Sequence, residues 1–142
     1  KIDPTYTKAQ KIFTALSELE KKEEIKAEQL MNTKIIDVSP NESIKDTIAK
    51  MKKAQISQLP VIDNHKLMGI VSESIILDAM LNSKATKVKE IMQEAPPIVS
   101  KNTSIQVVSN LLRYYPMVIV SEEGSIIGLI TKADLLGKLY KS

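Results

Sequence analysis

Two side chains near the C-terminus of the chain could work together as a binding site. The stretch Gly128-Leu129-Ile130-Thr131-Lys132-Ala133-Asp134 begins with a glycine and two aliphatic residues, which are typical of a buried strand ending at the threonine. A helix that begins after Thr131 would bring its hydroxyl, the unpaired N–H groups of the first turn and the Asp134 carboxylate to one place.

Two interpretations fit this arrangement. In the first, Thr131 is an N-cap and Asp134 takes the acidic position of a capping box. In the second, the carboxylate accepts hydrogen bonds from the two vicinal hydroxyls of a ribose, while Thr131 and the helix end hold a phosphate or another polar group. Lys132 either meets that phosphate or faces solvent. The ribose interpretation fails if the carboxylate faces no cavity or bonds only to its own main chain.

The same pattern occurs earlier in the chain. Gly69-Ile70-Val71-Ser72 repeats the glycine, the aliphatic pair and the hydroxyl, and 59 residues separate Ser72 from Thr131. Further segments match in the same order: 27–31 with 88–92, 35–39 with 97–100, 43–44 with 104–105 and 58–63 with 116–121. A long unit present only twice predicts two tandem modules packed together, not an open array.

Over residues 27 to 140 the chain resembles a pair of CBS domains, a Bateman module. The resemblance lies in the repeated order of short motifs: I-M, V-S, S-I, L-P-V-I-D and G-I-V-S, followed by G-L-I-T-x-x-D. The resemblance implies an α/β (α+β) sandwich of two tandem β-α-β-β-α modules related by a pseudo-twofold axis. Their predicted boundaries are 27–84 and 85–142, after a helix and linker at 1–26. Such pairs usually sense adenosyl compounds between the two modules, so the resemblance implies AMP, ADP, ATP or S-adenosylmethionine as ligand.

The resemblance also implies particular site residues in the second module. Thr131 and Asp134 stand at the family's hydroxyl and ribose-carboxylate positions. Pro97 and Ile98, on the first strand of that module, would flank the purine. Met117 and Val118 would lie opposite, and main-chain groups of these strand ends would read the purine edge.

The first module departs from this pattern, because Ser72 keeps the hydroxyl but Ile75 occupies the carboxylate position. Ribose hydroxyls that face an isoleucine would lack partners, at a cost of roughly 1–3 kcal/mol. We therefore expect one good site in the second module and a weak or empty twin in the first.

The second module departs from the first at Tyr114 and Tyr115, which fill a shorter connection before Pro116. One tyrosine could stack on the ligand. The alternative, which we expect, is that both seal the edge of the core, because a buried tyrosine needs only one partner for its hydroxyl.

The predicted elements follow the repeat. Hydrophobic spacing, caps and turn residues give each module a short strand, a helix, a hairpin and a second helix. In the first module these are 35–38, 43–51, 59–62 with 67–71, and 73–81; in the second they are 98–99, 104–113, 117–120 with 126–130, and 132–140.

The N-terminal segment resembles the end of a phage-repressor-type helix-turn-helix domain. Pro4 suits the first turn of a helix, and residues 6–24 carry apolar side chains at helical spacing. Archaeal predicted regulators that join such a head to a CBS pair resemble the chain in both parts. The recognition helix is absent from the sequence, so DNA would be contacted only through a missing N-terminal domain.

Composition excludes several classes of function. The 142 residues contain no cysteine and one histidine, His65, in a predicted turn, so neither a thiolate metal site nor a Ser-His-acid triad is supported. The net charge of +3 is scattered over lysines, which argues against direct nucleic-acid binding. No apolar run could span a membrane. We expect a cytoplasmic, non-enzymatic, homodimeric sensor; the alternatives are a regulatory module of an enzyme or transporter, and a structural dimerisation module without ligand.

Overall fold

The structure is a computed structural model that describes residues 25–140 of the 142-residue chain. The helix predicted for residues 6–24 lies outside the described residues. Within the described part, two compact units form: unit 1 contains residues up to 34 together with those from 97 onward, and unit 2 contains residues 35–96.

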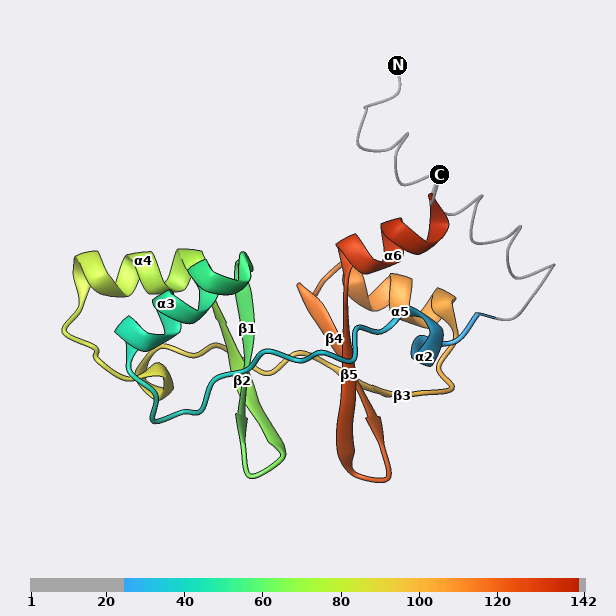
Figure 1. The fold of residues 1–142 in the computed structure, drawn as a ribbon, viewed down its shortest axis with the longest axis horizontal. Helices are drawn as coiled ribbons and strands as arrows, with labels where there is room; N and C mark the ends of the chain where they lie inside the picture. Colours follow the sequence, from blue (N-terminus) through green and yellow to red (C-terminus); the bar gives the residue numbers. More distant parts are fainter. Residues whose placement is uncertain (1–24, 141–142) are drawn as a thin grey trace, which may run out of the picture. The chain divides into compact units, whose positions relative to one another are not determined.

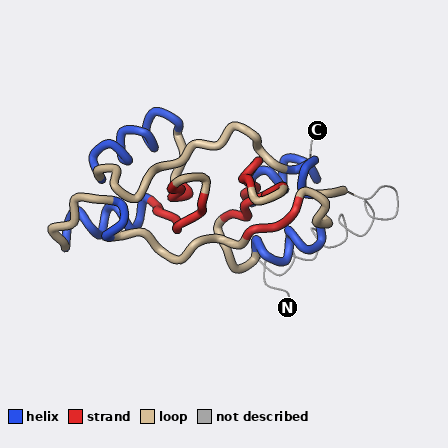
Figure 2. The backbone as a smooth tube through the Cα atoms, turned by 90° about the horizontal axis from the view of Figure 1, so that it is seen from below, coloured by secondary structure: helices blue, strands red, loops and turns tan. Residues whose placement is uncertain are grey.

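Unit 1 is a three-stranded sheet with helices beside it (Figures 1 and 2). The strand order is β3-β4-β5, with β3 parallel to β4 and β4 antiparallel to β5. The elements are α2 (Ala27–Leu30), β3 (Ile98–Ser100), α5 (Ile105–Leu112), β4 (Met117–Glu122), β5 (Ser125–Thr131) and α6 (Lys132–Leu139).

Unit 2 repeats this order with a smaller sheet, in which β1 and β2 pair antiparallel. A hairpin turn at Asn64 and His65, both with positive φ, joins the two strands and leaves His65 exposed. The elements are α3 (Ile44–Ala54), β1 (Gln58–Asp63), β2 (Lys66–Ser72), α4 (Glu73–Asn82) and the short 3-10 helix η1 (Val88–Glu90).

Each unit has its own aliphatic core, as the low aromatic content requires. In unit 1 the buried face of the sheet packs on α2, α5 and α6; in unit 2 the hairpin packs on α3 and α4. The central residues are Ile25, Leu30, Ile105, Val108, Val120 and Ile130 in unit 1, and Val38, Leu59, Val61, Val71, Ile76 and Val88 in unit 2. Full burial of one such side chain stabilises the fold by about 1.5–3 kcal/mol.

The strand predicted at Ile35–Val38 is wrong, because only Val38 pairs with a neighbour, Val61. The reason is Pro60. In unit 1 the Ile119 N–H donates to the Pro97 carbonyl at 2.9 Å. The hairpin registers put Pro60, which pairs with Ile70, at the position of Ile119, which pairs with Leu129. A proline has no N–H to donate, so the first rung of the ladder cannot form in unit 2.

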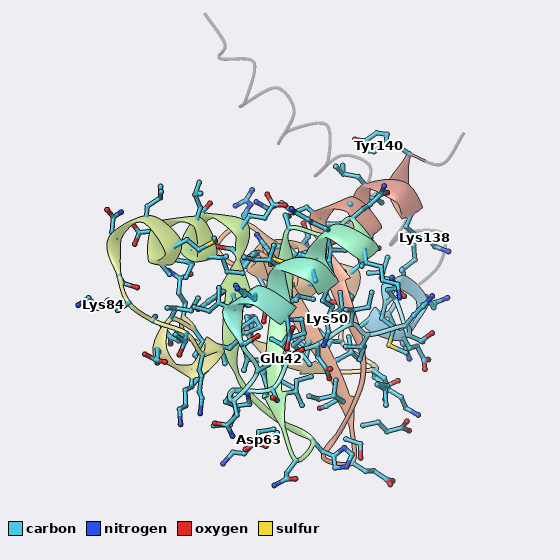
Figure 3. All side chains as sticks on the ribbon, turned by 60° about the vertical axis from the view of Figure 1, so that its left-hand side comes forward. Glu42, Lys50, Asp63, Lys84, Lys138 and Tyr140 are labelled. Atoms are coloured by element: carbon cyan, nitrogen blue, oxygen red, sulfur yellow. The ribbon has the colours of Figure 1, made fainter. Side chains whose placement is uncertain are left out.

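A lysine side chain secures the segment that lacks this rung. Lys50, on α3, donates to the Asp37 carbonyl at 2.7 Å and lies 3.3 Å from the Glu42 carboxylate. Figure 3 labels Lys50 and Glu42. The Lys50 side chain therefore ties this segment to α3.

Each unit includes a short segment from the other half of the sequence. In unit 1 Met31 lies against Gly128, where an added Cβ would meet the methionine sulfur at 2.5 Å. In unit 2 an added Cβ on Gly69 would meet the Gln93 carbonyl oxygen at 2.5 Å. Main-chain hydrogen bonds fasten each segment, and among them Asn32 and Leu129 exchange two in unit 1, as Gln93 and Ile70 do in unit 2. The module boundary at 84/85 stays a prediction along the sequence, while the compact units are defined in space.

Among the helices of residues 25–140, none is long and apolar enough to cross a membrane.

Candidate functional site

Three strand ends of unit 1 meet at one edge of its sheet. Met117 pairs with Thr131, so β4 begins where β5 ends. Because β3 runs parallel to β4, with Ile98 opposite Ile119, β3 begins at the same edge. The topology therefore brings together seven of the eight predicted site residues: Pro97, Ile98, Met117, Val118, Thr131, Lys132 and Asp134. The eighth, Ser72, lies in unit 2.

Helix α6 starts at this edge with a reciprocal capping box. The Thr131 hydroxyl accepts a hydrogen bond from the Asp134 N–H at 3.4 Å, and Asp134 Oδ2 accepts one from the Thr131 N–H at 2.9 Å. The two side chains also lie 3.1 Å apart, with the Thr131 hydroxyl donating to Oδ2. The capping interpretation is confirmed. Such a box satisfies two N–H groups that a helix start would otherwise leave unpaired.

All the hydrogen bonds that the Asp134 carboxylate accepts from the described residues belong to this cap. The carboxylate bonds to Thr131 alone, but to its hydroxyl as well as its main-chain N–H, so it does not bond only to main chain. All three bonds of the cap use the same carboxylate oxygen or the aspartate N–H, and Oδ1 accepts none from the described residues. Asp134 is half-buried. The cap thus fixes the carboxylate in place and leaves one oxygen able to accept further hydrogen bonds.

The other predicted residues differ in what they expose. Ile98 is 53% exposed and Pro97 is half-buried, so both have side-chain surface at the edge. Met117 and Val118 are buried, and Val118 packs in the unit 1 core. The Val118 side chain is therefore closed to a ligand, and its main chain pairs with Ile130 in the β4–β5 ladder. Lys132 is exposed.

The matching helix start in unit 2 is simpler. The Ser72 hydroxyl accepts a hydrogen bond from the Ile75 N–H at 3.3 Å, but no carboxylate returns the bond. Ile75 is half-buried and lines a cavity of about 490 Å³ together with Asp78, Ala79, Ser83, Lys84, Ala85, Glu90 and Ile91. The hydroxyl expected at this position is present, and an aliphatic surface replaces the acid.

The expectation that Tyr114 and Tyr115 seal the core edge is wrong. Tyr114 is 80% exposed and Tyr115 is 40% exposed. Both N–H groups donate to the Leu111 carbonyl, at 3.1 and 3.0 Å, so the chain turns sharply after α5 and carries the two rings outward. The shorter connection, which was visible in the sequence, was the signal that these residues do not repeat the packing seen in unit 2.

Within residues 25–140, no group of three or more His, Asp or Glu side chains could hold a metal ion. The described site therefore consists of a hydroxyl, a carboxylate, a lysine and main-chain groups.

The CBS domain family model matches the chain twice, over residues 27–82 and 88–141. The chain belongs to the CBS domain family, and its two copies make it a CBS pair. The two matches begin with the two short segments that complete the units, 27–31 and 88–92. The resemblance seen in the sequence is thereby confirmed for the fold and for the pair.

The curated relatives that the chain matches are longer proteins. The chain is 33% identical over 113 residues to an inosine-5'-monophosphate dehydrogenase of Korarchaeum cryptofilum, covering 78% of this chain and 23% of that protein. It is 25% identical over 123 residues to the choline transport ATP-binding protein OpuBA of Bacillus subtilis, covering 82% of this chain and 31% of that one. The chain thus spans less than a third of either relative.

Solved structures share the fold over most of their length. A hemolysin-like CBS protein of Oenococcus oeni is 26% identical, with a TM-score of 0.75, covering 91% of this chain and 98% of that one. CBSX2, solved in complex with AMP, is 22% identical, with a TM-score of 0.71, covering 80% of this chain and 94% of that one.

Proposed function

We propose that the chain is the ligand-sensing regulatory module of a larger protein and binds an adenosyl compound at the start of α6. The observation that carries the proposal is the Asp134 carboxylate, fixed by its cap through Oδ2 and with Oδ1 unused, at the edge where three strand ends meet. A fixed acceptor needs little reordering when it binds a diol, so less of the binding energy is lost.

The proposed ligand follows from the groups at this edge. Oδ1 accepts from the ribose hydroxyls, and the Thr131–Lys132 helix start holds a phosphate or another polar group. Pro97 and Ile98 supply apolar contact to the purine, and the main chain at Met117, the first residue of β4, reads its edge, while Val118 supports this strand end from the core. AMP, ADP, ATP and S-adenosylmethionine share the diol and the purine. AMP is bound in the CBSX2 structure, which makes this ligand class a reasonable first choice for the test.

The regulatory step requires two conformations of the protein. A ligand shifts a conformational equilibrium only by the difference between its affinities for the two states. Helix α6 begins at the ligand and is eight residues long, so a small rotation of its first turn would move its far end. The sensor would act in the cytoplasm, where adenine nucleotides are made and used.

The effector that the module controls is a separate part of the proposal. The N-terminal sequence pattern supports a helix-turn-helix transcriptional regulator of archaeal type, with DNA bound by a domain that precedes Lys1. The curated relatives support the alternative, a module that regulates an enzyme or a transport protein. The sequence upstream of Lys1 in the full protein separates the two: a helix-turn-helix pattern favours the regulator, and a catalytic or ATP-binding domain favours the alternative.

A homodimer is also part of the proposal, and one face of α4 supports it. Leu77, Met80 and Leu81 are 59%, 61% and 74% exposed, and their spacing puts them on one side of the helix. Contiguous apolar surface of this kind marks an interface more often than a solvated face. We expect light scattering to give twice the chain mass. The double variant Leu77→Glu/Leu81→Glu should be monomeric, while Asn82→Lys, on the opposite side of the same helix, should stay dimeric.

Calorimetric titration with AMP, ATP and S-adenosylmethionine tests the ligand. We expect at least one to bind, and Asp134→Ala to weaken that binding at least tenfold. Because Asp134→Ala also removes a cap worth about 1 kcal/mol, the control is Ser43→Ala, which removes the N-cap of α3. Ser43→Ala should lower stability by a similar amount and leave the affinity unchanged.

Two results would overturn the sensor proposal. If none of the three compounds produces heat or raises the melting temperature, the module without ligand, serving dimerisation alone, is favoured. If Asp134→Ala binds as well as the parent chain, the carboxylate is a cap and nothing more.

A further inference from the structure

The connection between α5 and β4 exposes two aromatic rings that the core does not use. Tyr114 and Tyr115 are 80% and 40% exposed, and neither belongs to the unit 1 core or to the partly buried residues packed on it. The matching connection in unit 2 behaves differently, because Ile56 packs on the unit 2 core. Unit 1 therefore has aromatic surface at a place where unit 2 has a core contact.

The position of the connection places these rings beside the candidate site. Tyr115 precedes the first residue of β4, Met117, by two positions, and Met117 pairs with Thr131. The residues before Met117 therefore continue past the edge of the sheet on the side where α6 begins. Unit 2 shows the same adjacency directly: the Ser57 carbonyl, one residue before β1, accepts a hydrogen bond from the first N–H of α4, that of Glu73, at 2.9 Å.

Exposed tyrosine rings on the side of the sheet where the Asp134 carboxylate lies are suited to stacking on the base of a nucleoside. A ring face binds flat bases by stacking, and this contact tolerates any base because every base has a π face. The capped carboxylate recognises a sugar and cannot tell whether a base is attached. Stacking supplies that distinction without any hydrogen-bonding group on the base.

We infer that Tyr114 and Tyr115 form the base-binding surface of the adenosyl site and give it its preference for nucleosides over simple sugar phosphates. The inference rests on the proposed function of the α6 start. The rings hold the flat face of the purine, Asp134 Oδ1 holds the ribose hydroxyls, and Pro97 and Ile98 line the adjoining strand end. Replacement of either ring by phenylalanine keeps the stacking face and removes only the hydroxyl.

The test compares three variants of the chain by calorimetric titration with AMP and with ribose 5-phosphate. Stacking on a protein ring accounts for roughly a tenfold to hundredfold change in affinity per base. We expect Tyr114→Ala/Tyr115→Ala to weaken AMP binding by at least tenfold, and Tyr114→Phe/Tyr115→Phe to stay within twofold of the parent chain. The parent chain should bind ribose 5-phosphate at least tenfold more weakly than AMP.

The matched control is Tyr140→Ala, since Tyr140 is 52% exposed at the opposite end of α6 from Thr131 (Figure 3). It should leave the AMP affinity unchanged. Proton NMR provides a second measurement: stacking on AMP should shift ring protons of Tyr114 or Tyr115 upfield and leave those of Tyr140 in place.

The outcomes separate this inference from the proposed function. If the double alanine variant binds AMP within twofold of the parent while Asp134→Ala loses binding, the stacking role is wrong and the sensor stands. Equal affinity for AMP and ribose 5-phosphate would also overturn the stacking role. If the parent chain binds no nucleotide at all, both fall together.

Discussion

The starts of α6 and α4 are the same place in two copies of one module, and the difference that matters for binding is the third helical residue, Asp134 in α6 and Ile75 in α4. Both helices follow a glycine, two aliphatic residues and a hydroxyl, and in both the hydroxyl accepts a hydrogen bond from the N–H three residues on. Only α6 has an acid there to return the bond. The residue in the matching position of α4, Ile75, lines a cavity instead.

This difference separates what the fold requires from what the ligand would require. A serine alone starts α4, so the fold does not need the acid to begin the helix. Asp134 adds a second capping bond through Oδ2 and an acceptor, Oδ1, that the described residues do not use. A residue with a dispensable structural role and an unused polar atom is the natural place to look for binding.

The largest loss of stability is expected from substitutions at Gly69 and Gly128, the glycines that contact the short segment from the other half of the sequence in each unit. Gly69→Ala would drive a Cβ to 2.5 Å from the Gln93 main-chain oxygen and break both bonds to Ile70, with a loss of about 3 kcal/mol. Gly128→Ala should cost about 2 kcal/mol, because part of the Met31 side chain can move away. Urea denaturation measures both. Gly137→Ala, with nothing within 4 Å of the new Cβ, should be neutral or stabilising; equal losses at all three sites would contradict the account.

Loss of the N-cap hydroxyl should cost more stability at Thr131, in unit 1, than at Ser72, in unit 2. Thr131→Ala removes a hydroxyl that bonds to both the N–H and the carboxylate of Asp134, and it should cost about 1.5 kcal/mol. Ser72→Ala removes one bond of 3.3 Å and should cost about 0.7 kcal/mol. Thermal melting without ligand would show the order. A larger loss for Ser72→Ala would mean that the reciprocal box contributes nothing to α6.

The substitution Ile75→Asp converts the α4 start into the α6 pattern. We expect the new carboxylate to complete a capping box and to raise stability by about 0.5 kcal/mol before any loss of apolar contact. If the acid is what the first module lacks, the stoichiometry of AMP binding should rise from one to two per chain. Calorimetric titration measures it. An unchanged stoichiometry would show that the strand ends of unit 2, and not Ile75 alone, keep the twin site empty.

The smallest effect concerns Lys101 and Glu122, an exposed ion pair of unit 1. The Glu122 carboxylate accepts a hydrogen bond from the Lys101 ammonium and attracts its charge, which raises the pKa of Lys101 above its ordinary 10.5. A raised folded-state pKa gives stability that is fully present below pH 10.5 and is lost as the pH rises through the folded pKa. Lys101→Met should therefore lower the melting temperature slightly at pH 8 and less at pH 11. Lys34→Met, which removes no ion pair, should not show this dependence.

The sequence predicted most of the fold because the repeat could be read twice. Hydroxyl caps at Ser43 and Ser104 and the turn residues at 64–65 and 123–124 located the starts of the helices and the hairpin turns, while the end of α3, at Ala54, lies three residues beyond the predicted 51 because no local signal marked it. The strand at 35–38 failed for a reason the sequence did contain, since Pro60 cannot donate the bond that Ile119 donates. However, the segment at 35–38 would have to pair with β1, which is distant in the sequence, and only the structure shows that these two segments are neighbours.

The candidate site was predicted less completely. The spacing of Thr131 and Asp134 implied both the cap and the ribose contact, and spacing cannot say which carboxylate oxygen is used. Apolar residue type also did not reveal that Val118 is buried while Ile98 is 53% exposed. The tyrosines were expected to seal the core edge because a buried tyrosine needs only one partner for its hydroxyl, but the sharp turn after α5 leaves both rings exposed.

Because each unit contains a short segment from the other half of the sequence, the chain cannot be cut between its two modules without removing part of both units. A cut near residue 84 would leave the first half without the Met92 segment and the second half without the Met31 segment. Neither fragment would then be a complete folding unit, but each would carry the piece that the other needs. Mixed together, the two should reassemble as a split protein does.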